Sequence, residues 1–290
     1  MKNVILAKTA GFCWGVKRAI DIAMEVAYSS NKKIYTYGPL IHNPQVIAKL
    51  ENSNIFELTE SDNLKDNSTV IIRTHGVTPE VRTNLEANNC NLTDATCPLV
   101  AKVQRVIKKY ANRGFSTIIV GDKGHAEVIG LIGFTNSRGI VINSINDIDQ
   151  LPKLDSVNVV AQTTCDQKLY ERLIIRLKER FTNIVIHNTI CDATIERQSE
   201  VIELADKVDL MVVVGGRNSA NTKRLADISE AAGTKTLLVE TEDDINTEEL
   251  ICPNIIGVTA GASTPSWLIS GVVDKIKRCR LENQHEALND

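Results

Sequence analysis

Residues 94–99 read Asp94-Ala95-Thr96-Cys97-Pro98-Leu99, and this stretch places a thiol where a short strand-like run meets a long amphipathic helix. Two other cysteines occupy the same kind of junction. Cys13 follows Lys8-Thr9-Ala10-Gly11-Phe12, and Cys191 follows His187-Asn188-Thr189-Ile190, each just before a helical pattern. A helix N-terminus stabilises negative charge through its unpaired backbone N–H groups, so all three positions favour the thiolate.

Each of these cysteines is followed by the same order of expected elements: a helix, a strand, a polar loop, a second helix and a second strand. The first strand of each segment ends at a glycine, and the three are Gly38, Gly121 and Gly215. A polar residue follows at nearly the same distance in each loop, at His42, His125 and Ser219. The second strands end at the polar residues His75, Thr163 and Ser263. Such repetition predicts three copies of one structural unit, even where residue identity is low.

The alternation of strands and helices predicts an α/β fold with parallel sheets, in which ligands collect at the carboxyl ends of the strands. Three similar units with matching edges would pack most simply in a pseudo-threefold trefoil, with their cysteines and loops at the centre. The expected boundaries are 14–96, 97–190 and 191–282 for the three units, and 283–290 for a frayed polar tail. The strand within residues 1–13 is expected to pair onto the third unit and close the ring.

The composition excludes several classes of partner. The 290 residues include 33 Lys and Arg against 36 Asp and Glu, with a pI near 6.0, which argues against nucleic acid and against an anionic membrane. Apolar runs such as Leu210-Met211-Val212-Val213-Val214 have the length of strands and are too short to cross a bilayer. The chain starts with the strand-like Val4-Ile5-Leu6-Ala7 instead of a signal peptide, and its seven cysteines are widely spaced. A reducing, cytoplasmic location is therefore expected.

Three converging thiolates are one ligand short of a closed tetrahedral zinc site or of a fully ligated four-iron cluster. Because cysteine is the only soft ligand in the set, the first interpretation is a [4Fe–4S] cluster with one open iron, and the second is a catalytic zinc. The alternative is that all three are small buried core residues. The four other cysteines do not recur in the repeats and are expected to be structural: Cys90, Cys165, Cys252 and Cys279. Trp14 and Trp267 are expected to pack.

The polar residues at the strand ends form a second set with a shared chemistry. All six are neutral or weakly basic hydrogen-bond donors: His42, His75, His125, Thr163, Ser219 and Ser263. Such donors around a metal describe a pocket for a polyoxyanion, since helix N-termini and hydroxyls bind phosphate without a basic patch. Glu127, two residues after His125, would place an acid in that pocket. Taken alone, Glu127 would be a common solvated helix residue, and one histidine at a strand end is more often a capping residue than a functional one.

Together these motifs closely resemble one family, the 4-hydroxy-3-methylbut-2-enyl diphosphate reductases, the last enzymes of the methylerythritol phosphate route to isoprenoids. The similar stretches span nearly the whole chain in the right order: Gly11-Phe12-Cys13-Trp14-Gly15-Val16-Lys17-Arg18-Ala19, His42-Asn43, Thr74-His75-Gly76-Val77, Asp94-Ala95-Thr96-Cys97-Pro98-Leu99-Val100, Gly124-His125-Ala126-Glu127-Val128, Gln162-Thr163-Thr164, Asn218-Ser219-Ala220-Asn221 and Gly257-Val258-Thr259-Ala260-Gly261-Ala262-Ser263.

The resemblance implies a trefoil of three α/β units around an oxygen-sensitive [4Fe–4S] cluster held by Cys13, Cys97 and Cys191. The substrate's hydroxyl would bind the unique iron. The implied diphosphate ligands are His42, His75, His125, Ser219, Asn221 and Ser263. Catalytic roles near the hydroxyl are implied for Glu127 and Thr163, together with His125. The implied reaction is a reductive dehydroxylation that takes two electrons and two protons, gives isopentenyl and dimethylallyl diphosphates, and draws its electrons from ferredoxin or flavodoxin.

One departure from the family pattern affects a single contact. Many family members carry a second hydroxyl or an amide where this chain has Ala220, which puts one diphosphate contact in doubt. Two other functions remain open. An iron–sulfur hydro-lyase would also leave one iron open for a substrate hydroxyl but would need no electron donor. A non-catalytic iron–sulfur redox sensor would not need the six donors of an anion pocket.

Overall fold

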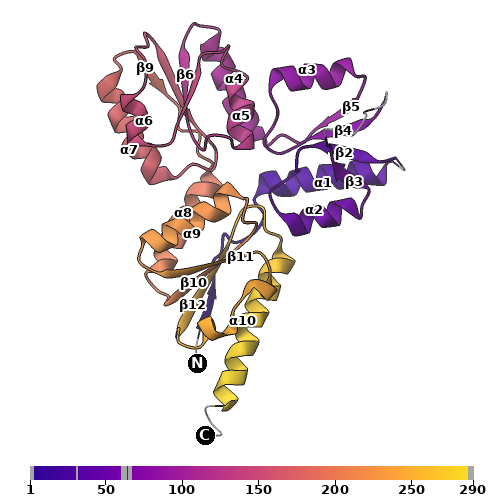
Figure 1. Cartoon of the computed structure of the whole chain (residues 1–290), viewed down its shortest axis with the longest axis vertical. Helices are drawn as coiled ribbons and strands as arrows, with labels where there is room; N and C mark the ends of the chain where they lie inside the picture. Colours follow the sequence, from indigo (N-terminus) through magenta and orange to yellow (C-terminus); the bar gives the residue numbers. More distant parts are fainter. Residues whose placement is uncertain (1–2, 31, 60–63, 65–66, 287–290) are drawn as a thin grey trace. The chain divides into compact units, whose positions relative to one another are not determined.

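The computed structural model describes residues 3–30, 32–59, 64 and 67–286 of the chain. The described strands form three parallel sheets with helices between most successive strands, which confirms the α/β class expected from the sequence (Figure 1). Parallel neighbours cannot be joined by a tight hairpin, so each connection must carry the chain back to the end of the sheet where the previous strand began. As a result, the carboxyl ends of all strands in a sheet lie at the same end of that sheet.

The first sheet lies between Cys13 and Cys97 in the sequence. Its strands, in spatial order, are β3 (Ile55–Glu57), β2 (Ile34–Tyr37), β4 (Thr69–Ile72) and β5 (Asn91–Asp94). Its helices are α1 (Trp14–Tyr28), α2 (Pro44–Glu51) and α3 (Pro79–Ala87). The Thr78 hydroxyl caps α3 by accepting a hydrogen bond from the Val81 N–H, and Pro79 opens the helix where an early N–H has no partner.

The second sheet lies between Cys97 and Cys191. Its strands, in spatial order, are β7 (Gly139–Ile142), β6 (Ser116–Val120), β8 (Val157–Ala161) and β9 (Ile184–Ile186). Its helices are α4 (Pro98–Ala111), α5 (Ala126–Ile132), α6 (Ile145–Asp149) and α7 (Gln167–Arg180). One face of this sheet is covered by α4 and α5, whose Val103, Ile107 and Leu131 pack on Ile119 and Val160.

The third sheet follows Cys191 and takes its last strand from the other end of the chain. Its strands, in spatial order, are β11 (Lys235–Val239), β10 (Leu210–Val214), β12 (Ile255–Ala260) and β1 (Asn3–Leu6). Its helices are α8 (Asp192–Ala205), α9 (Ala220–Ala231) and α10 (Ser266–Glu286), with the 3-10 turns η1 (Glu242–Asp244) and η2 (Thr247–Leu250). The parallel pairing of β1 with β12 runs from Asn3 opposite Ile255 to Leu6 opposite Val258.

The three sheets have one topology. When the strands are counted from the cysteine that opens each repeat, with β1 taken as the fourth strand of the third sheet, the second strand forms an edge and is followed in space by the first, third and fourth strands. The fourth strand, at the other edge, leads into a cysteine: β5 into Cys97, β9 into Cys191 and β1 into Cys13. The structure therefore extends the repeat seen in the sequence by one further strand per unit, since β3, β7 and β11 are edge strands that the sequence reading does not include.

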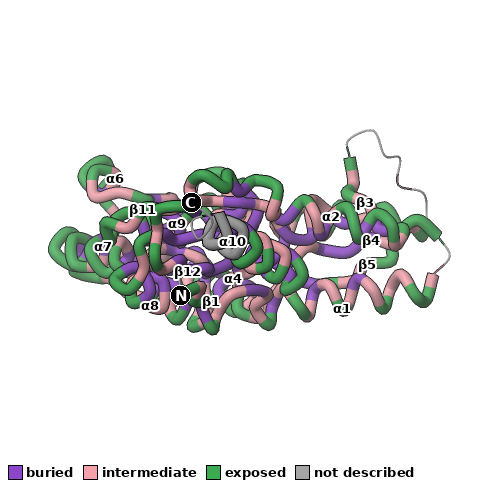
Figure 2. The backbone as a smooth tube through the Cα atoms, turned by 90° about the horizontal axis from the view of Figure 1, so that it is seen from below, coloured by how far each residue is buried: buried purple, intermediate pink, exposed green. Residues whose placement is uncertain are grey.

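The inner strands are buried on both faces. All five residues of β10 are buried, as are all five of β8. Strand β4, which Figure 2 labels, has three of its four residues buried. In the third sheet, Val212 packs with Val272 of α10 on one face, and Met211 packs with Val201 of α8 on the other. This double coverage explains why these strands are continuous apolar runs instead of alternating polar and apolar residues.

The chain divides into two compact units. One contains Gly15–Ile41 and Ile47–Cys191, which hold the first and second sheets. The other contains Met1–Trp14, His42–Val46 and Asp192–Asp290, which hold the third sheet. The boundaries 14–96, 97–190 and 191–282 stay a prediction. Helix α10 continues through Glu286, into the segment for which a frayed tail is expected, and residues 287–290 lie outside the described part. Within that part, no helix is both long enough and apolar enough to cross a bilayer.

Candidate functional site

Each of the three cysteines is attached to its own sheet by the same backbone hydrogen bond. The Cys97 N–H donates to the Thr74 carbonyl at 2.9 Å, the Cys191 N–H to the Thr163 carbonyl at 2.9 Å, and the Cys13 N–H to the Ala262 carbonyl at 3.1 Å. In every case the acceptor lies two residues beyond the end of the third strand, β4, β8 or β12. The cysteines are half-buried, and α1, α4 and α8 begin at the residue that follows each of them. The side chain is thus fixed at a helix N-terminus without being enclosed in a core.

Two arginines hold the segments that lead into the cysteines. The guanidinium of Arg197, 4% exposed on α8, donates from Nη2 to the Gly11 carbonyl at 2.6 Å. Arg18 of α1 donates from Nη1 to the Thr96 carbonyl, directly before Cys97, at 3.3 Å. Gly11 itself has φ +110°, a conformation that L side chains rarely adopt, so the turn into Cys13 requires glycine. Trp14, expected to pack, is 64% exposed beside that turn, and Trp267 is 42% exposed.

The loops after the first strands present a capping residue to the following helix. His125 caps α5 by accepting the Glu127 N–H at Nδ1, and Ser219 caps α9 by accepting the Thr222 N–H. In the first repeat this role belongs to Asn43, whose Oδ1 accepts the Val46 N–H at 3.0 Å. His42 therefore lies one residue before the position equivalent to His125 and Ser219.

Asn43 is a candidate site residue that the sequence reading missed. It is 1% exposed, and its Nδ2 has no hydrogen-bond partner among the described residues. A buried amide without an acceptor is costly unless a ligand or water supplies one, so Asn43 is available to donate. The signal was present in the sequence, because Asn43 followed by Pro44 is a typical N-cap and first helical residue.

Thr163 differs in register from the residues with which its spacing grouped it. Its carbonyl accepts the Cys191 N–H, as those of Thr74 and Ala262 accept the other cysteine N–H groups. Thr163 is therefore equivalent to Thr74 and Ala262, and it lies one position before the place that His75 and Ser263 occupy in their repeats. The backbone of Thr163 is therefore hydrogen-bonded to Cys191, and its hydroxyl is hydrogen-bonded to Glu127.

The carboxylate of Glu127 is held by Thr163. The Thr163 backbone N–H donates to Oε1 at 2.7 Å, and its hydroxyl Oγ1 donates to Oε2 at 2.7 Å. Both residues are buried, Glu127 with 2% and Thr163 with 7% of its surface exposed. Burial raises the pKa of Glu127 to about 7, an effect that the two Thr163 hydrogen bonds oppose and that the nearby charge of Asp122 increases. Glu127 can therefore exchange a proton near neutral pH.

The same unit brings His75 and His125 together. Their ring centroids lie 5.2 Å apart with the planes at 87°. Because His125 Nδ1 accepts the Glu127 N–H, a neutral His125 carries its proton on Nε2 and can donate it to an anion. His75 Nδ1 lies 3.5 Å from Thr74 Oγ1, whose hydroxyl donates to the Leu40 carbonyl at 3.0 Å.

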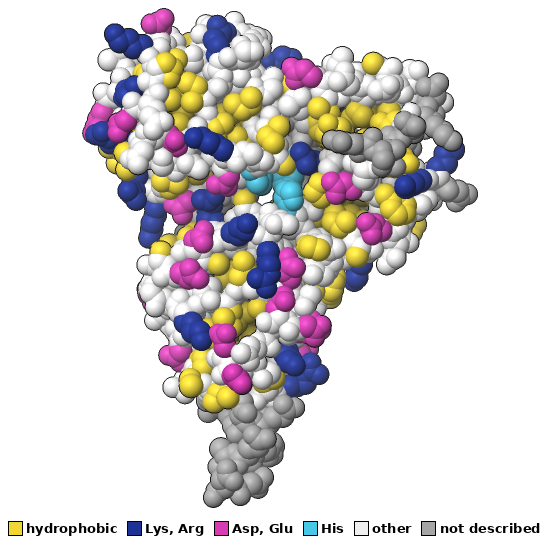
Figure 3. All heavy atoms as spheres, in the orientation of Figure 1, with side chains coloured by type: hydrophobic (Ala, Val, Ile, Leu, Met, Phe, Trp, Pro, Cys, Tyr) yellow, Lys and Arg dark blue, Asp and Glu magenta, His cyan; other side chains and the backbone are white. Residues whose placement is uncertain are grey.

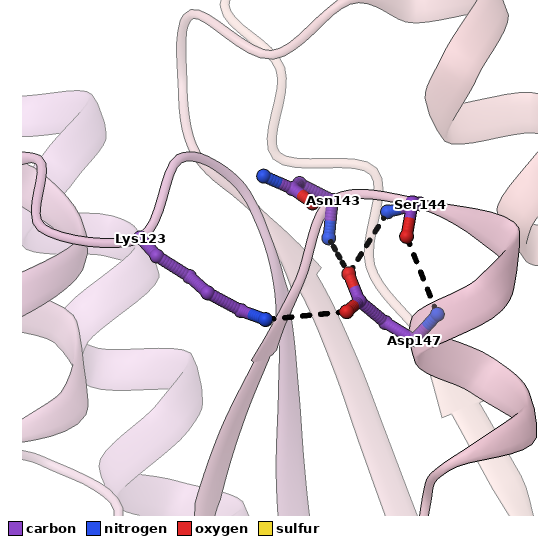
Figure 4. A network of polar contacts seen from close by, with 4 residues as sticks. All are labelled: Lys123, Asn143, Ser144 and Asp147. Carbon is purple, nitrogen blue, oxygen red and sulfur yellow. Dashed lines mark hydrogen bonds and ion pairs between the residues drawn. The ribbon is translucent and has the colours of Figure 1, made fainter.

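The loop from Gly121 to Glu127 is also anchored at its surface. Lys123 Nζ lies 3.2 Å from Asp147 Oδ1, and Asp147 Oδ2 accepts the N–H groups of Asn143 and Ser144 at the start of α6 (Figure 4). The Asn143 and Ser144 hydrogen bonds and the charge of Lys123 lower the pKa of Asp147. This exposed ion pair links the loop that presents His125 and Glu127 to the start of α6.

The other unit collects the remaining predicted donors. The Ser263 hydroxyl donates to the His42 carbonyl at 3.4 Å. Gly216 approaches the same carbonyl so closely that an added Cβ would lie 2.6 Å from the oxygen, so only glycine fits there. Asn221 is 6% exposed in the first turn of α9, and its Nδ2 has no hydrogen-bond partner within the described chain. Like Asn43, it is a buried donor available for a ligand.

The predicted site residues thus form two sets. His75, His125, Glu127 and Thr163, with Cys97 and Cys191, belong to one unit, and His42, Ser219, Asn221 and Ser263, with Cys13, belong to the other. On the face of the molecule shown in Figure 3, positively and negatively charged side chains are interspersed, and neither kind dominates. The predicted anion ligands lie in the loops after strands or in the first turn of a helix, and none of them is Lys or Arg.

The sequence of this chain matches the family described as LytB protein over residues 4–277. It is 43% identical over 280 residues to 4-hydroxy-3-methylbut-2-enyl diphosphate reductase of Clostridium perfringens, covering 95% of this chain and 99% of that protein. Identity to the protein of the same name from Thermoanaerobacter pseudethanolicus is 42% over 287 residues, which covers 98% of this chain and 100% of that one. A longer relative with this name, from Clostridium acetobutylicum, is 40% identical over 287 residues, and the chain spans 45% of its length.

Two solved structures are similar to the chain. The E-1-hydroxy-2-methyl-but-2-enyl-4-diphosphate reductase from Plasmodium falciparum aligns with a TM-score of 0.91 at 30% identity, covering 94% of this chain and 87% of that one. A second structure, described as (E)-4-hydroxy-3-methyl-but-2-enyl diphosphate reductase, the terminal enzyme of the non-mevalonate pathway, aligns with a TM-score of 0.70 at 38% identity over 96% of this chain and 100% of that chain.

Proposed function

The chain belongs to the LytB protein family, and from this premise we propose that it reduces 4-hydroxy-3-methylbut-2-enyl diphosphate to isopentenyl diphosphate and dimethylallyl diphosphate. The observation that carries the proposal is the buried Glu127–Thr163 pair next to the loop of Cys191. Removing a hydroxyl group from an allylic alcohol requires a proton for the leaving oxygen, and this pair can supply one.

The donor set of the three cysteines fits a [4Fe–4S] cluster. All three are half-buried thiols at helix N-termini, each on an identical strand-to-helix turn, and cysteine thiolates are the usual ligands of such clusters. Cys13, Cys97 and Cys191 would hold the cluster, and the fourth iron would be left without a protein ligand. When bound, such a cluster supplies electrons and an open iron position. Catalytic zinc, the second interpretation of three thiolates, would not supply the two electrons of this reduction.

Glu127 and Thr163 together form a relay for the proton that the leaving hydroxyl needs. The Thr163 N–H fixes Oε1 of the carboxyl group, so Oε2 faces the Thr163 hydroxyl at 2.7 Å. When Glu127 is ionised, Oε2 accepts the hydroxyl proton. When Glu127 is protonated, it donates from Oε2 to Thr163 Oγ1, which frees the threonine's own proton for the leaving hydroxyl. With its pKa near 7, Glu127 is substantially protonated at neutral pH, as a general acid should be.

We propose that the diphosphate is bound by neutral donors from the repeated loops: His42, His75, His125, Ser219, Asn221 and Ser263. His125 donates from Nε2, and Asn221 supplies a buried amide that lacks a partner within the described chain. Asn43, with the same property, joins this set. Ala220 offers no side-chain donor, so Asn43 is the one amide that this proposal adds to the six ligands implied by the family pattern.

The two electrons would come from a one-electron carrier protein of the ferredoxin or flavodoxin type. We infer a cytoplasmic location from the chemistry of the cysteines: all seven lie in the described chain, none is in a disulfide, and thiol ligands persist in a reducing compartment.

The experiment that tests the function compares products with and without a reductant. Anaerobically purified protein with its cluster should convert the hydroxylated diphosphate to the two isopentenyl isomers only when an electron donor is present. A hydro-lyase would form a product without any donor, and a redox sensor would form none under either condition. Either of these results would reject the proposed reaction.

A further inference from the structure

The helix that begins directly after Cys97 has a charge pattern that the proposed reaction does not use. Between Asp94 and Asp122 the chain has no acidic residue, although its net charge is −3. The same stretch contains five basic residues on and just after α4, which we call the α4 cationic face: Lys102, Arg105, Lys108, Lys109 and Arg113. Every other α-helix contains at least one Asp or Glu.

All five side chains are exposed. Lys102, Arg105 and Lys109 follow one another at three- and four-residue steps, which places them on one side of the helix. Val100, Val103 and Ile107, with the same steps, are buried on the other side. None of the five forms an ion pair with a described residue, and Arg105 only donates to the Ala101 carbonyl of its own helix. Lys109 and Arg113 lie over the ring of Tyr110, with 5.8 Å and 5.6 Å to the ring centroid. These contacts account for part of the charge, but neither they nor an ion pair with a described residue accounts for Lys102 and Arg105.

The helix dipole accounts for only part of the pattern. Cations are favoured in the last turn of a helix, which explains Lys108 and Lys109. Lys102 and Arg105 lie nearer the N-terminus, where the dipole gives no such preference. Leu99, one step before Lys102, is 39% exposed and adds an apolar group at the end of the face next to Cys97. An apolar contact beside complementary charges is typical of a transient protein interface.

We propose that the α4 cationic face docks an acidic one-electron carrier protein, so that its redox centre comes to the Cys97 end of the helix. This inference rests on the proposed function, which requires an external electron donor. The face runs from Lys102 to Arg113, which is about 17 Å at 1.5 Å per residue; this length exceeds a diphosphate and suits a macromolecule. Complementary charge would steer the carrier into repeated short encounters. The excess of acidic residues in the chain as a whole disfavours nucleic acid as the occupant.

The test uses the holoenzyme, a plant-type [2Fe–2S] ferredoxin as protein donor, and reduced methyl viologen as a small donor that needs no docking site. Lys102→Glu combined with Arg105→Glu should raise the KM for ferredoxin at least about tenfold at about 0.02 M salt, and much less at about 0.5 M salt, where charges are screened. Turnover with methyl viologen should stay within about twofold. The dissociation constant of oxidised ferredoxin, measured by calorimetry, should rise by the same factor as KM.

Two controls separate docking from other effects. Arg172→Glu with Lys178→Glu makes the same change of charge on exposed positions of α7, which also carries Glu171 and Glu179, and should leave the KM for ferredoxin unchanged. Lys102→Arg with Arg105→Lys keeps the charge and should behave as the parent. If the reversal does not fold, Lys102→Gln with Arg105→Gln gives the same comparison with a smaller shift.

An unchanged KM and dissociation constant in the Lys102→Glu, Arg105→Glu variant would overturn the proposal. So would an equal loss with both donors, or a loss of affinity for an RNA oligonucleotide without any change toward ferredoxin. A parent enzyme inactive even with methyl viologen would instead reject the proposed function, and the calorimetric comparison would still decide the docking surface.

Discussion

At the scale of single residues, the pairing of Glu127 with Thr163 determines what this site can do. Thr163 donates two hydrogen bonds of 2.7 Å to the buried carboxylate of Glu127. Burial raises the pKa of Glu127 to about 7. We expect Glu127→Gln to lower turnover by about 10² to 10⁴, because the amide keeps the shape but cannot donate the acid's proton. Iron content and substrate affinity should persist. Turnover within about threefold of the parent, with chemistry rate-limiting, would remove this role from Glu127.

The relay through Thr163 makes a separate prediction. Thr163→Val removes the hydroxyl at nearly constant shape and should reduce turnover about as much as Glu127→Gln, whereas Thr163→Ser should retain most activity. Because the two groups act on one proton, the double variant should be little slower than either single one. Single-turnover rates of the four proteins give the comparison. Fully additive losses would mean that Glu127 and Thr163 act independently.

The raised pKa of Glu127 also predicts a pH dependence of stability. The ordinary pKa is 4.5 and the folded value is about 7, so between these pH values the folded state binds the extra proton. The contribution of Glu127 to the free energy of unfolding is therefore fully present below pH about 4.5. It falls by roughly 3 kcal/mol as the pH rises to about 7. In urea unfolding of the cluster-free protein, Glu127→Gln should gain stability relative to the parent from pH 5 to pH 8. If the difference in unfolding free energy between Glu127→Gln and the parent does not change with pH, burial does not raise the pKa of Glu127.

At the scale of elements, the repeated turn from edge strand to cysteine to helix separates two classes of cysteine. Only Cys13, Cys97 and Cys191 occupy it, each with its N–H bonded to a carbonyl beyond the third strand. Cys165 and Cys279 are buried, Cys90 is half-buried and Cys252 is exposed. We expect serine at any one of these four positions to leave the iron content of anaerobically purified protein unchanged. Loss of iron in one of these variants, with the protein still folded, would show that Cys13, Cys97 and Cys191 are not the only cluster ligands.

The buried strands and the helix starts could be predicted from sequence, because a continuous apolar run and a proline after a cap are local signals. The edge strands β3, β7 and β11 were not predicted. Strand β3 has only Ile55 and Phe56 as apolar residues, and the apolar runs of β7 and β11 are three residues long and only partly buried, so they are weak local signals. Spacing from the cysteines placed the loops correctly but not the register. The loop before α2 is one residue longer, so Asn43, and not His42, takes the capping position that corresponds to His125 and Ser219.

Of the candidate site, the sequence indicated the residues but not their environment. Nothing local to Glu127 shows that it is 2% exposed, because its burial comes from the packing of α5 on the second sheet, and Thr163 is 36 residues away. The cluster ligands, the diphosphate ligands and the unit boundaries stay predictions. The family, the α/β fold with three parallel sheets and the reductase assignment are confirmed.

At the scale of the whole molecule, the proposed diphosphate ligands belong to both compact units, with His75 and His125 in one and Ser219 and Asn221 in the other. One anion bound by both sets would link the units and shift the population toward a linked form. Saturating substrate should therefore slow amide hydrogen exchange in the loops of both units. Protection confined to one unit would show that the other set does not bind the diphosphate.

The central proposal is that Cys13, Cys97 and Cys191 are the three protein ligands of one [4Fe–4S] cluster. Iron and sulfide analysis with Mössbauer spectroscopy, on anaerobically purified parent and single serine variants, tests it most directly. The parent should contain about four irons per chain in one [4Fe–4S] cluster with a distinct iron. Serine at any of the three positions should abolish or strongly deplete the cluster. A full cluster in one of these variants, or a parent that binds a single zinc ion instead, would contradict the account.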